Sequence, residues 1–256
     1  MVVSVHSRAC HLRLDAGFLL VVVPPAVPLS PNGVAVDLAP HAWRRGHAVE
    51  LGADALAGAE VWEPRPRVGR LTPHALADRL HATRAVALGE GTTPSLLPLL
   101  WESPDAWGVA GPARRLCAAA IRRDSASVAR AATSLAGLGP GLTPSGDDFL
   151  AGFAAAWTLL AASLARDGAA RRRVTAAVES GARAGASPLG HAWLAHAVRG
   201  ELPEPMTRFA GALLDAEPRD LAVAVRGVLA VGASSGTDWT VGFLLGGAAA
   251  LEASWS

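Results

Sequence analysis

The segment Gly137-Leu-Gly-Pro-Gly-Leu-Thr-Pro-Ser-Gly-Asp-Asp-Phe-Leu-Ala-Gly152 places turn-forming residues directly before a long apolar run. A second segment, Ser235-Gly-Thr-Asp-Trp-Thr-Val-Gly-Phe243, repeats the pattern of Ser145–Phe153 and is identical to it at five positions. In both segments a Ser-Gly turn precedes aromatic and aliphatic residues at helical spacing. We therefore expect two apolar helices in the C-terminal half of the chain, each beginning at one of these turns.

The two turns also fit a purely structural interpretation. Ser145 with Asp148, and Ser235 with Asp238, match the capping box, in which side chains at a helix start satisfy free backbone amides. Capping boxes are common, and the aromatic residues that follow would then only form the core. This interpretation assigns no ligand to the turns, and the sequence leaves it open.

Glycines before both turns favour a ligand site over simple caps. Gly137, Gly139 and Gly141 are more than a cap requires, and Gly232 precedes the second turn. Glycine lets a backbone approach a ligand closely and leaves its amides accessible. At a helix N-terminus the macrodipole adds a partial positive charge, which favours phosphate or carboxylate. The two turns therefore predict an anion site.

Glycine also occurs inside both predicted helices, at Gly152 and Gly242. At such a position it costs about 1 kcal/mol relative to alanine. A close crossing of the two helices would offset this cost. We expect the helices to cross at these glycines, so that their N-termini converge on one pocket.

Three carboxylates complicate an anion site. Asp147, Asp148 and Asp238 would repel an anion unless a cation such as Mg²⁺ bridges them, an arginine neutralises them, or one of them acts as acid or base. A capping box does not explain Asp147, so we assign it metal contact or acid–base chemistry. The chain contains no lysine and lacks the glycine spacing of a dinucleotide fingerprint, which excludes the ordinary nucleotide-binding motifs.

The candidate site divides by chemistry. Asp147, Asp148 and Asp238 are its expected catalytic carboxylates, of which Asp148 and Asp238 orient the site. The expected anion-binding residues supply hydroxyls or backbone amides: Gly139, Gly141, Thr143, Ser145, Gly146, Ser234, Ser235, Gly236 and Thr237. All of them come from the two turns, so the site depends on the turns meeting.

The N-terminal part of the chain has the pattern of a small β-rich domain. Asn32-Gly33 is its strongest turn signal, because both residues accept positive φ at low cost. We expect a small antiparallel sheet or barrel over residues 1–66, with a linker at Pro64-Arg65-Pro66. Short alternating or β-branched runs predict strands over Val2–His6, Arg8–Leu14, Phe18–Val23, Gly33–Leu38 and Ala48–Leu51.

From Thr72 onward the pattern becomes helical, with a threonine cap and Pro73 at the first helical position. The predicted fold class is therefore α+β, in which residues 67–256 form a mainly helical domain that carries the paired turns. Helices are predicted over Pro73–Leu88, Ser95–Trp101, Ala113–Ala136, Ser145–Arg166, Ala169–Gly185, Ser187–Val198, Glu204–Asp215, Pro218–Val231 and Thr237–Ala253.

Composition excludes several classes of protein. The net charge of +1 and the absence of a long basic run argue against nucleic acid as a partner. Cys10 and Cys117 form neither a disulfide framework nor a zinc motif. Charged residues interrupt the N-terminal stretch where a signal peptide needs an apolar core, and Phe149–Ala165 and Trp239–Leu251 are shorter than the about 20 residues that span a bilayer. We expect a cytoplasmic protein with no membrane role.

The segment from Gly137 to Gly152 resembles the signature of the AllH family, connected with a subunit of bacterial oxamate carbamoyltransferase, and Gly232-Ala-Ser-Ser-Gly-Thr-Asp238 is similar to its second signature. His6-Ser7, Pro31-Asn32-Gly33 and Trp62-Glu63-Pro64 resemble weaker landmarks, so the resemblance spans nearly the whole chain. It implies phosphorolysis of oxalurate to oxamate and carbamoyl phosphate, together with other subunits, in allantoin degradation and purine catabolism. These substrates are small anions, which suits two helix N-termini.

One position departs from the family pattern. Where the family carries a threonine and a serine one turn apart before a helix, this chain has Ser187 and Gly190, so the second hydroxyl is missing. We expect a transferase subunit that binds a small anionic substrate and phosphate. Two alternatives stay open: a non-catalytic anion-binding or assembly subunit whose partner chain carries the chemistry, and turns that are only caps while the pocket lies elsewhere.

Overall fold

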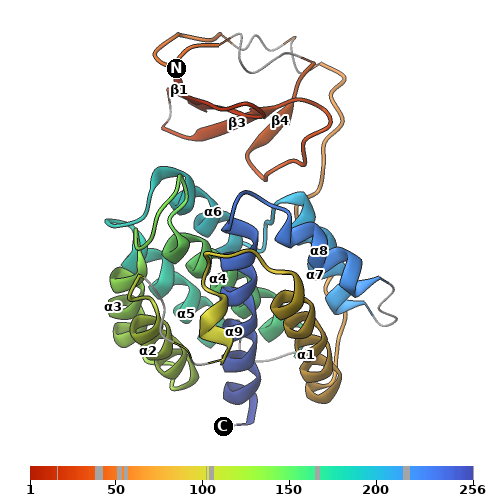
Figure 1. The fold of residues 1–256 in the computed structure, drawn as a ribbon, viewed down its shortest axis with the longest axis vertical. Helices are drawn as coiled ribbons and strands as arrows, with labels where there is room; N and C mark the ends of the chain where they lie inside the picture. Colours follow the sequence, from red (N-terminus) through yellow and green to blue (C-terminus); the bar gives the residue numbers. More distant parts are fainter. Residues whose placement is uncertain are drawn as a thin grey trace. The chain divides into compact units, whose positions relative to one another are not determined.

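Short apolar runs near the N-terminus form a four-stranded sheet in the computed structural model of the chain (Figure 1). Neighbouring strands follow the sequence order, and the first three are antiparallel. Val2, Cys10, Leu12 and Val22 are buried and form the core beside this sheet. The strands are β1 (Val2–Val5), β2 (Cys10–Arg13), β3 (Leu19–Val23) and β4 (Gly33–Ala35).

The chain divides into two units, Met1–Arg65 and Pro66–Ser256, each with a hydrophobic core of its own. The structure describes residues 1–15, 17–37, 43–50, 54, 57–101, 103, 107–164, 168–215 and 220–255. The predicted element ends at Leu38, Leu51, Arg166 and Pro218 lie outside these residues.

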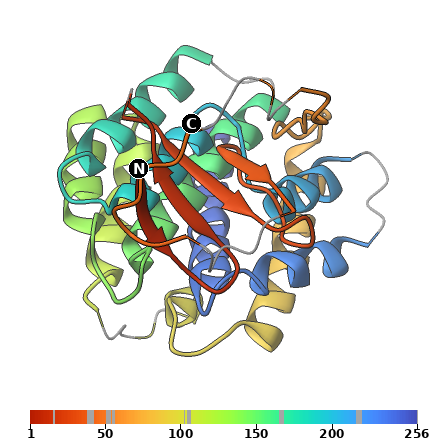
Figure 2. The ribbon, with the colours of Figure 1, turned by 90° about the horizontal axis from the view of Figure 1, so that it is seen from above.

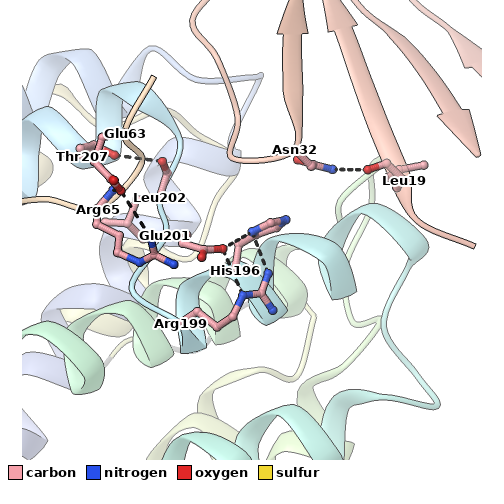
Figure 3. Close-up of polar contacts among 9 residues, drawn as sticks. All are labelled: Leu19, Asn32, Glu63, Arg65, His196, Arg199, Glu201, Leu202 and Thr207. Carbon is pink, nitrogen blue, oxygen red and sulfur yellow. Dashed lines mark hydrogen bonds and ion pairs between the residues drawn. The ribbon is translucent and has the colours of Figure 1, made fainter. Parts of the chain in front are cut away.

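The sheet is not purely antiparallel as predicted, because β4 pairs with β3 in parallel. The chain turns before β4, where the Gly33 amide donates to the Ser30 carbonyl at 2.7 Å. Neither Asn32 nor Gly33 has the positive φ expected of a hairpin turn. Instead, the Asn32 side-chain amide donates to the carbonyl of Leu19 at 2.9 Å (Figure 3). Leu19 begins β3, so β4 starts at the same end of the sheet and runs in the same direction.

The sheet is also open, since β1 and β4 are its edge strands within the described residues. The predicted barrel is therefore not formed there. The fifth predicted strand, Ala48–Leu51, is likewise not found, because residues 48–50 belong to no strand. The α+β fold class itself is confirmed by the sheet and the helices that follow it.

The second unit is helical, and α9 lies inside the group, with α1 on one side and α2 and α3 on the other (Figures 1 and 2). Side chains of α4 are buried along nearly its whole length. No helix among the described residues is long and apolar enough to cross a membrane. The elements are α1 (Pro73–Glu90), η3 (Leu97–Trp101), α2 (Ala110–Ile121), α3 (Ser125–Leu135), α4 (Ser145–Ser163), α5 (Gly168–Ala182), α6 (Pro188–Val198), α7 (Glu204–Leu214), α8 (Leu221–Leu229) and α9 (Ser235–Trp255).

The predicted helix Ala113–Ala136 is divided into α2 and α3. Arg123 has a φ of 57°, in the left-handed region that a helix cannot continue through. Asp124 then caps α3 by accepting a hydrogen bond from the Ser127 amide at 3.1 Å. The apolar periodicity runs across this break, which is why it predicted a single helix; the Asp-x-x-Ser cap is the signal that divides it.

The crossing of α4 and α9 is confirmed to be close at the two in-helix glycines. A Cβ atom at Gly152 would lie 2.0 Å from the Trp239 carbonyl oxygen, and one at Gly242 would lie 2.1 Å from that of Phe149. Real Cβ atoms do not approach a carbonyl oxygen so closely, so only glycine permits this packing. The crossing lies one to two turns from each helix start, and it brings the two starts together.

Candidate functional site

The two turns that precede α4 and α9 lie side by side. The hydroxyl oxygens of Thr143, from the first turn, and Ser235, from the second, are 2.9 Å apart. This hydrogen bond joins residues far apart in the sequence, and it confirms the predicted convergence of the turns. One polar site is therefore shared by both helix starts.

The first turn is not a capping box. Pro144 is at the N-cap position of α4 and makes no side-chain cap bond, so Ser145 lies inside the helix rather than before it. The Asp148 carboxylate accepts a hydrogen bond from the Thr143 hydroxyl at 3.0 Å. The interpretation as a simple cap is therefore wrong for this turn, because neither side chain satisfies a free backbone amide there.

The hydroxyls of each turn affect the carboxyl of the other turn. The Ser235 hydroxyl lowers the pKa of Asp148, and the Ser145 hydroxyl lowers the pKa of Asp238, so each lies near the carboxyl of the other turn. Because the two turns have similar sequences, the two hydroxyl–carboxyl neighbours are equivalent by an approximate twofold relation. Both carboxyls consequently face the same small region.

Burial dominates the electrostatics of Asp148. It raises the pKa of this carboxyl well above its usual range, and the hydroxyls of Ser235 and Thr143 oppose that rise. The negative charges of Asp238 and Asp147 raise the pKa further. Asp148 is therefore a carboxyl whose charged form is disfavoured unless something positive binds beside it.

Asp238 has the same environment in milder form. Burial raises its pKa, while the Leu96 amide and the hydroxyls of Ser145 and Ser234 lower it. The Leu96 amide donates to Oδ1 of Asp238 at 2.6 Å. This bond fixes Oδ1 of Asp238, whereas Oδ2 takes no part in it.

Three buried polar atoms of the site have no hydrogen-bond partner among the described residues. They are Oδ1 of Asp148, Oδ2 of Asp238 and Oγ of Ser145, and these side chains are at most 1% exposed. The Ser145 hydroxyl affects the pKa of Asp238, yet it makes no hydrogen bond of acceptable geometry. A buried polar group without a hydrogen-bond partner costs about 1–3 kcal/mol. The two turns therefore contain several polar atoms that could still bind a ligand.

Asp147, by contrast, is fully engaged by backbone. Its Oδ1 accepts from the Gly137 amide and its Oδ2 from the Ser187 amide, both at 2.8 Å. A Cβ atom at Gly190 would lie 2.4 Å from Oδ2 of Asp147, so a larger residue at position 190 would displace the carboxylate. These bonds hold the first turn against the start of α6, which gives Asp147 a structural role. The lack of space beside Asp147 also explains why position 190 is glycine here rather than a residue with a hydroxyl.

Gly146 and Gly236 do not present free amides as predicted. The Gly146 amide donates to the Leu138 carbonyl at 2.8 Å, and the Gly236 amide donates to that of Val231 at 2.9 Å. A Cβ atom at Gly236 would also lie 1.8 Å from the carbonyl oxygen of Val228. Both glycines are needed because the turns fold back on the end of the preceding helix.

Gly139 and Gly141 belong to the loop before α4. Their φ angles of 97° and 106° are in the left-handed region that favours glycine. Their amides form no backbone hydrogen bond within the described part of the chain. A Cβ atom at Gly139 would lie 3.1 Å from the Ser145 hydroxyl oxygen, so this part of the loop packs closely against the start of α4.

A third loop, which the sequence analysis missed, completes the site. Thr92 contacts Thr237, with their hydroxyl oxygens 3.0 Å apart, and the Thr92 amide donates to the same Thr237 oxygen at 3.2 Å. Thr237 is thus engaged by protein rather than left for a ligand. A signal for this loop exists, because Gly91-Thr-Thr-Pro-Ser95 echoes Gly141-Leu-Thr-Pro-Ser145.

A separate polar cluster lies at the C-terminal end of α6. Nδ1 of His196 and Oε2 of Glu201 are 2.7 Å apart, and Arg199 donates to the same Glu201 oxygen at 3.1 Å (Figure 3). Burial lowers the pKa of His196, and the nearby Arg199 lowers it further, against the opposing effect of Glu201. These three side chains bond to one another, as is typical of a cluster that stabilises the fold.

A small hollow lies farther along α4 and α9. Its lining includes Arg123, Trp157, Arg171 and Ser254. The two arginines donate to helix carbonyls, those of Ala253 and Thr158. Position 157 is about 18 Å along α4 from its first residue at 1.5 Å per residue, so this hollow is not part of the paired turns.

No group of three or more His, Cys, Asp or Glu residues in the described part of the chain is arranged to hold a metal ion. Within the described residues, no third His, Cys, Asp or Glu side chain is therefore placed to bind a metal together with the two carboxyls of the paired turns. Any cation at the site would need hydroxyl, water or ligand oxygens in addition.

Residues 135–247 match a family described as oxamate carbamoyltransferase subunit AllH. The matched segment begins at the last residue of α3 and ends inside α9, so it contains both turns and the crossing helices. The resemblance recognised in the two signatures is confirmed over this segment. No solved structure matches the chain.

Proposed function

We propose, from the premise that residues 135–247 are an AllH segment, that this chain is a cytoplasmic subunit of an oxamate carbamoyltransferase whose paired turns bind small anionic substrates. The observation that carries the proposal is the contact between Thr143 and Ser235, which unites two helix starts in one polar site. The family description supports the reaction class and the presence of other subunits. Phosphate and the carboxylate of oxamate or oxalurate are the ligands we assign.

Two features of the site favour small anions. The N-termini of α4 and α9 converge, and each contributes the partial positive charge of a helix start. The amides of Gly139 and Gly141, in the loop before α4, form no backbone hydrogen bond among the described residues. Hydroxyls of Thr143, Ser145, Ser234 and Ser235 supply further donors for phosphate or carboxylate oxygens.

The proposed reaction is phosphorolysis of oxalurate. A phosphate oxygen forms a bond to the carbamoyl carbon, the bond between that carbon and the amide nitrogen breaks, and the phosphate proton moves to the nitrogen. The products are carbamoyl phosphate and oxamate. Asp148 and Asp238 are our candidates for orienting the reactants, because each has a buried oxygen without a hydrogen-bond partner among the described residues.

Other residues of the predicted site have positioning roles in this proposal. Asp147 holds the first turn against the start of α6, and Thr237 holds the second turn against the loop at Thr92. Gly146 and Gly236 let the turns pack on the preceding helices. None of these four contacts substrate directly.

The binding step is tested by calorimetry on the full chain, with oxamate and inorganic phosphate as probes. Removing the Ser235 hydroxyl with Ser235→Ala should weaken binding about tenfold, because one hydrogen bond to a charged group is lost. The exposed serine of α3 provides a control, and Ser134→Ala should bind both probes as the unmodified chain does. Equal binding by all three proteins would reject the paired turns as the anion site.

The catalytic step is tested by phosphate-dependent release of carbamoyl phosphate from oxalurate. We expect turnover when the chain is combined with its partner subunits, and loss of that turnover in Asp148→Asn. If the assembled complex of Asp148→Asn turns over normally while the chain alone binds phosphate, the chemistry belongs to a partner chain. This subunit then serves binding or assembly.

A further inference from the structure

We propose that Asp148, Asp238 and Ser145 form a binding site for a divalent cation of the Mg²⁺ class. The cation joins the two turns, and it accepts the oxygens of the anionic substrate in its remaining coordination positions. The substrate part of this inference rests on the proposed function, whereas cation binding by the chain alone does not.

The first argument is the set of unpaired atoms. Asp148 and Asp238 each have one oxygen bonded within the protein and one oxygen that is buried without a partner. The Ser145 hydroxyl, 1% exposed, is also unpartnered and faces Asp238. Three buried oxygen atoms from the two turns therefore have no hydrogen-bond partner in the described part of the chain. A bound cation would satisfy all three, since oxygen is the ligand atom that Mg²⁺ prefers.

The second argument is charge. The negative charges of Asp238 and Asp147 both raise the pKa of the buried Asp148 carboxyl, so these carboxylates lie close enough to repel one another. Neither Asp148 nor Asp238 forms an ion pair with an arginine or histidine among the described residues. Neutralisation by an arginine, which would let these carboxylates tolerate a bound anion, is therefore not observed among the described residues. A divalent cation would instead neutralise the pair and attract the substrate.

The third argument is the type and number of ligands. Mg²⁺ is commonly held by one or two protein carboxylates, with waters and substrate phosphate oxygens completing six positions. Two carboxylates and one hydroxyl match that pattern. The contacting side chains include no cysteine or histidine, which disfavours zinc and copper. The Leu96 amide, which belongs to neither turn, positions the Asp238 carboxyl.

The experiment measures binding of Mn²⁺, a spectroscopic substitute for Mg²⁺, to the full chain without oxamate or phosphate. Electron paramagnetic resonance should detect about one bound Mn²⁺ per chain, and added Mg²⁺ should displace it. Asp238→Asn should weaken binding by at least about tenfold, the lower end of what even outer-shell changes cost a metal site. Asp78→Asn, which alters an exposed carboxylate of α1, should bind Mn²⁺ unchanged.

Ser145→Ala keeps the test decisive if an aspartate variant does not fold, because it removes only an unpartnered hydroxyl. It should fold as judged by circular dichroism and bind Mn²⁺ more weakly. Unaltered Mn²⁺ binding in folded Asp238→Asn or Ser145→Ala would overturn the proposal, and so would absence of binding by the unmodified chain. If oxamate and phosphate still bind in that case, the cation site fails while the proposed function stands.

Discussion

At the scale of single residues, adjacent aspartates of one turn have different tasks. One buried oxygen of Asp148 has no hydrogen-bond partner among the described residues, whereas both oxygens of Asp147 accept backbone amides. The sequence singled out Asp147 because a capping box could not explain it. A structural bond to two distant amides explains it instead, and such bonds are invisible to local pattern.

Asp147→Asn tests this assignment. An asparagine side chain has only one acceptor oxygen, so one of the amides of Gly137 and Ser187 would lose its partner and face an NH₂ group. We expect the free energy of unfolding to fall by about 1–3 kcal/mol, measured by urea denaturation. Unchanged stability together with lost turnover would return Asp147 to the role of acid or base.

At the scale of elements, α4 and α9 act as a pair. The apolar runs predicted both helices and the internal glycines predicted their close crossing, and the contact at Gly152 and Gly242 accounts for glycine at those positions. Within α9, Trp239 and Phe243 stack with ring centroids 5.1 Å apart, and both make edge-to-face contacts with Phe209 of α7. The position of the site depends on this crossing, since the helix starts meet only if the helices approach closely.

Gly152→Ala should therefore destabilise the protein. The added methyl would lie 2.0 Å from the Trp239 carbonyl oxygen, and forced overpacking of this kind costs about 1–3 kcal/mol. Gly211→Ala is the matched control, because Gly211 is inside α7 with nothing within 4 Å of the added atom. There alanine should stabilise by about 0.5–1 kcal/mol. Thermal unfolding of both variants measures the contrast, and equal shifts would contradict the close crossing.

At the scale of the whole molecule, every residue of the candidate site belongs to the unit Pro66–Ser256. The matched family segment lies in that unit as well. The sheet of Met1–Arg65 has a separate core. Substrate binding is thus a property that we assign to the helical unit.

A fragment of residues 66–256 should fold and bind phosphate with the affinity of the full chain. The expectation follows from the separate cores of the two units, since a hydrophobic core of this size stabilises a domain by itself. Circular dichroism would measure its helix content, and calorimetry would measure phosphate binding. A helical fragment that fails to bind phosphate would assign part of the site to residues 1–65.

The sequence by itself determined the local features: where α1 and α4 begin, which glycines permit close packing, and which turns carry hydroxyls and carboxyls. These features follow from spacing along the chain and from the conformational preferences of single residues. Only the tertiary structure decided that β4 is parallel, that Ser145 faces Asp238 across the turns, that Asp147 is bonded to Ser187, and that the loop at Thr92 joins the site. Each of these contacts joins segments distant in sequence, and their partners are chosen by how the helices and strands pack.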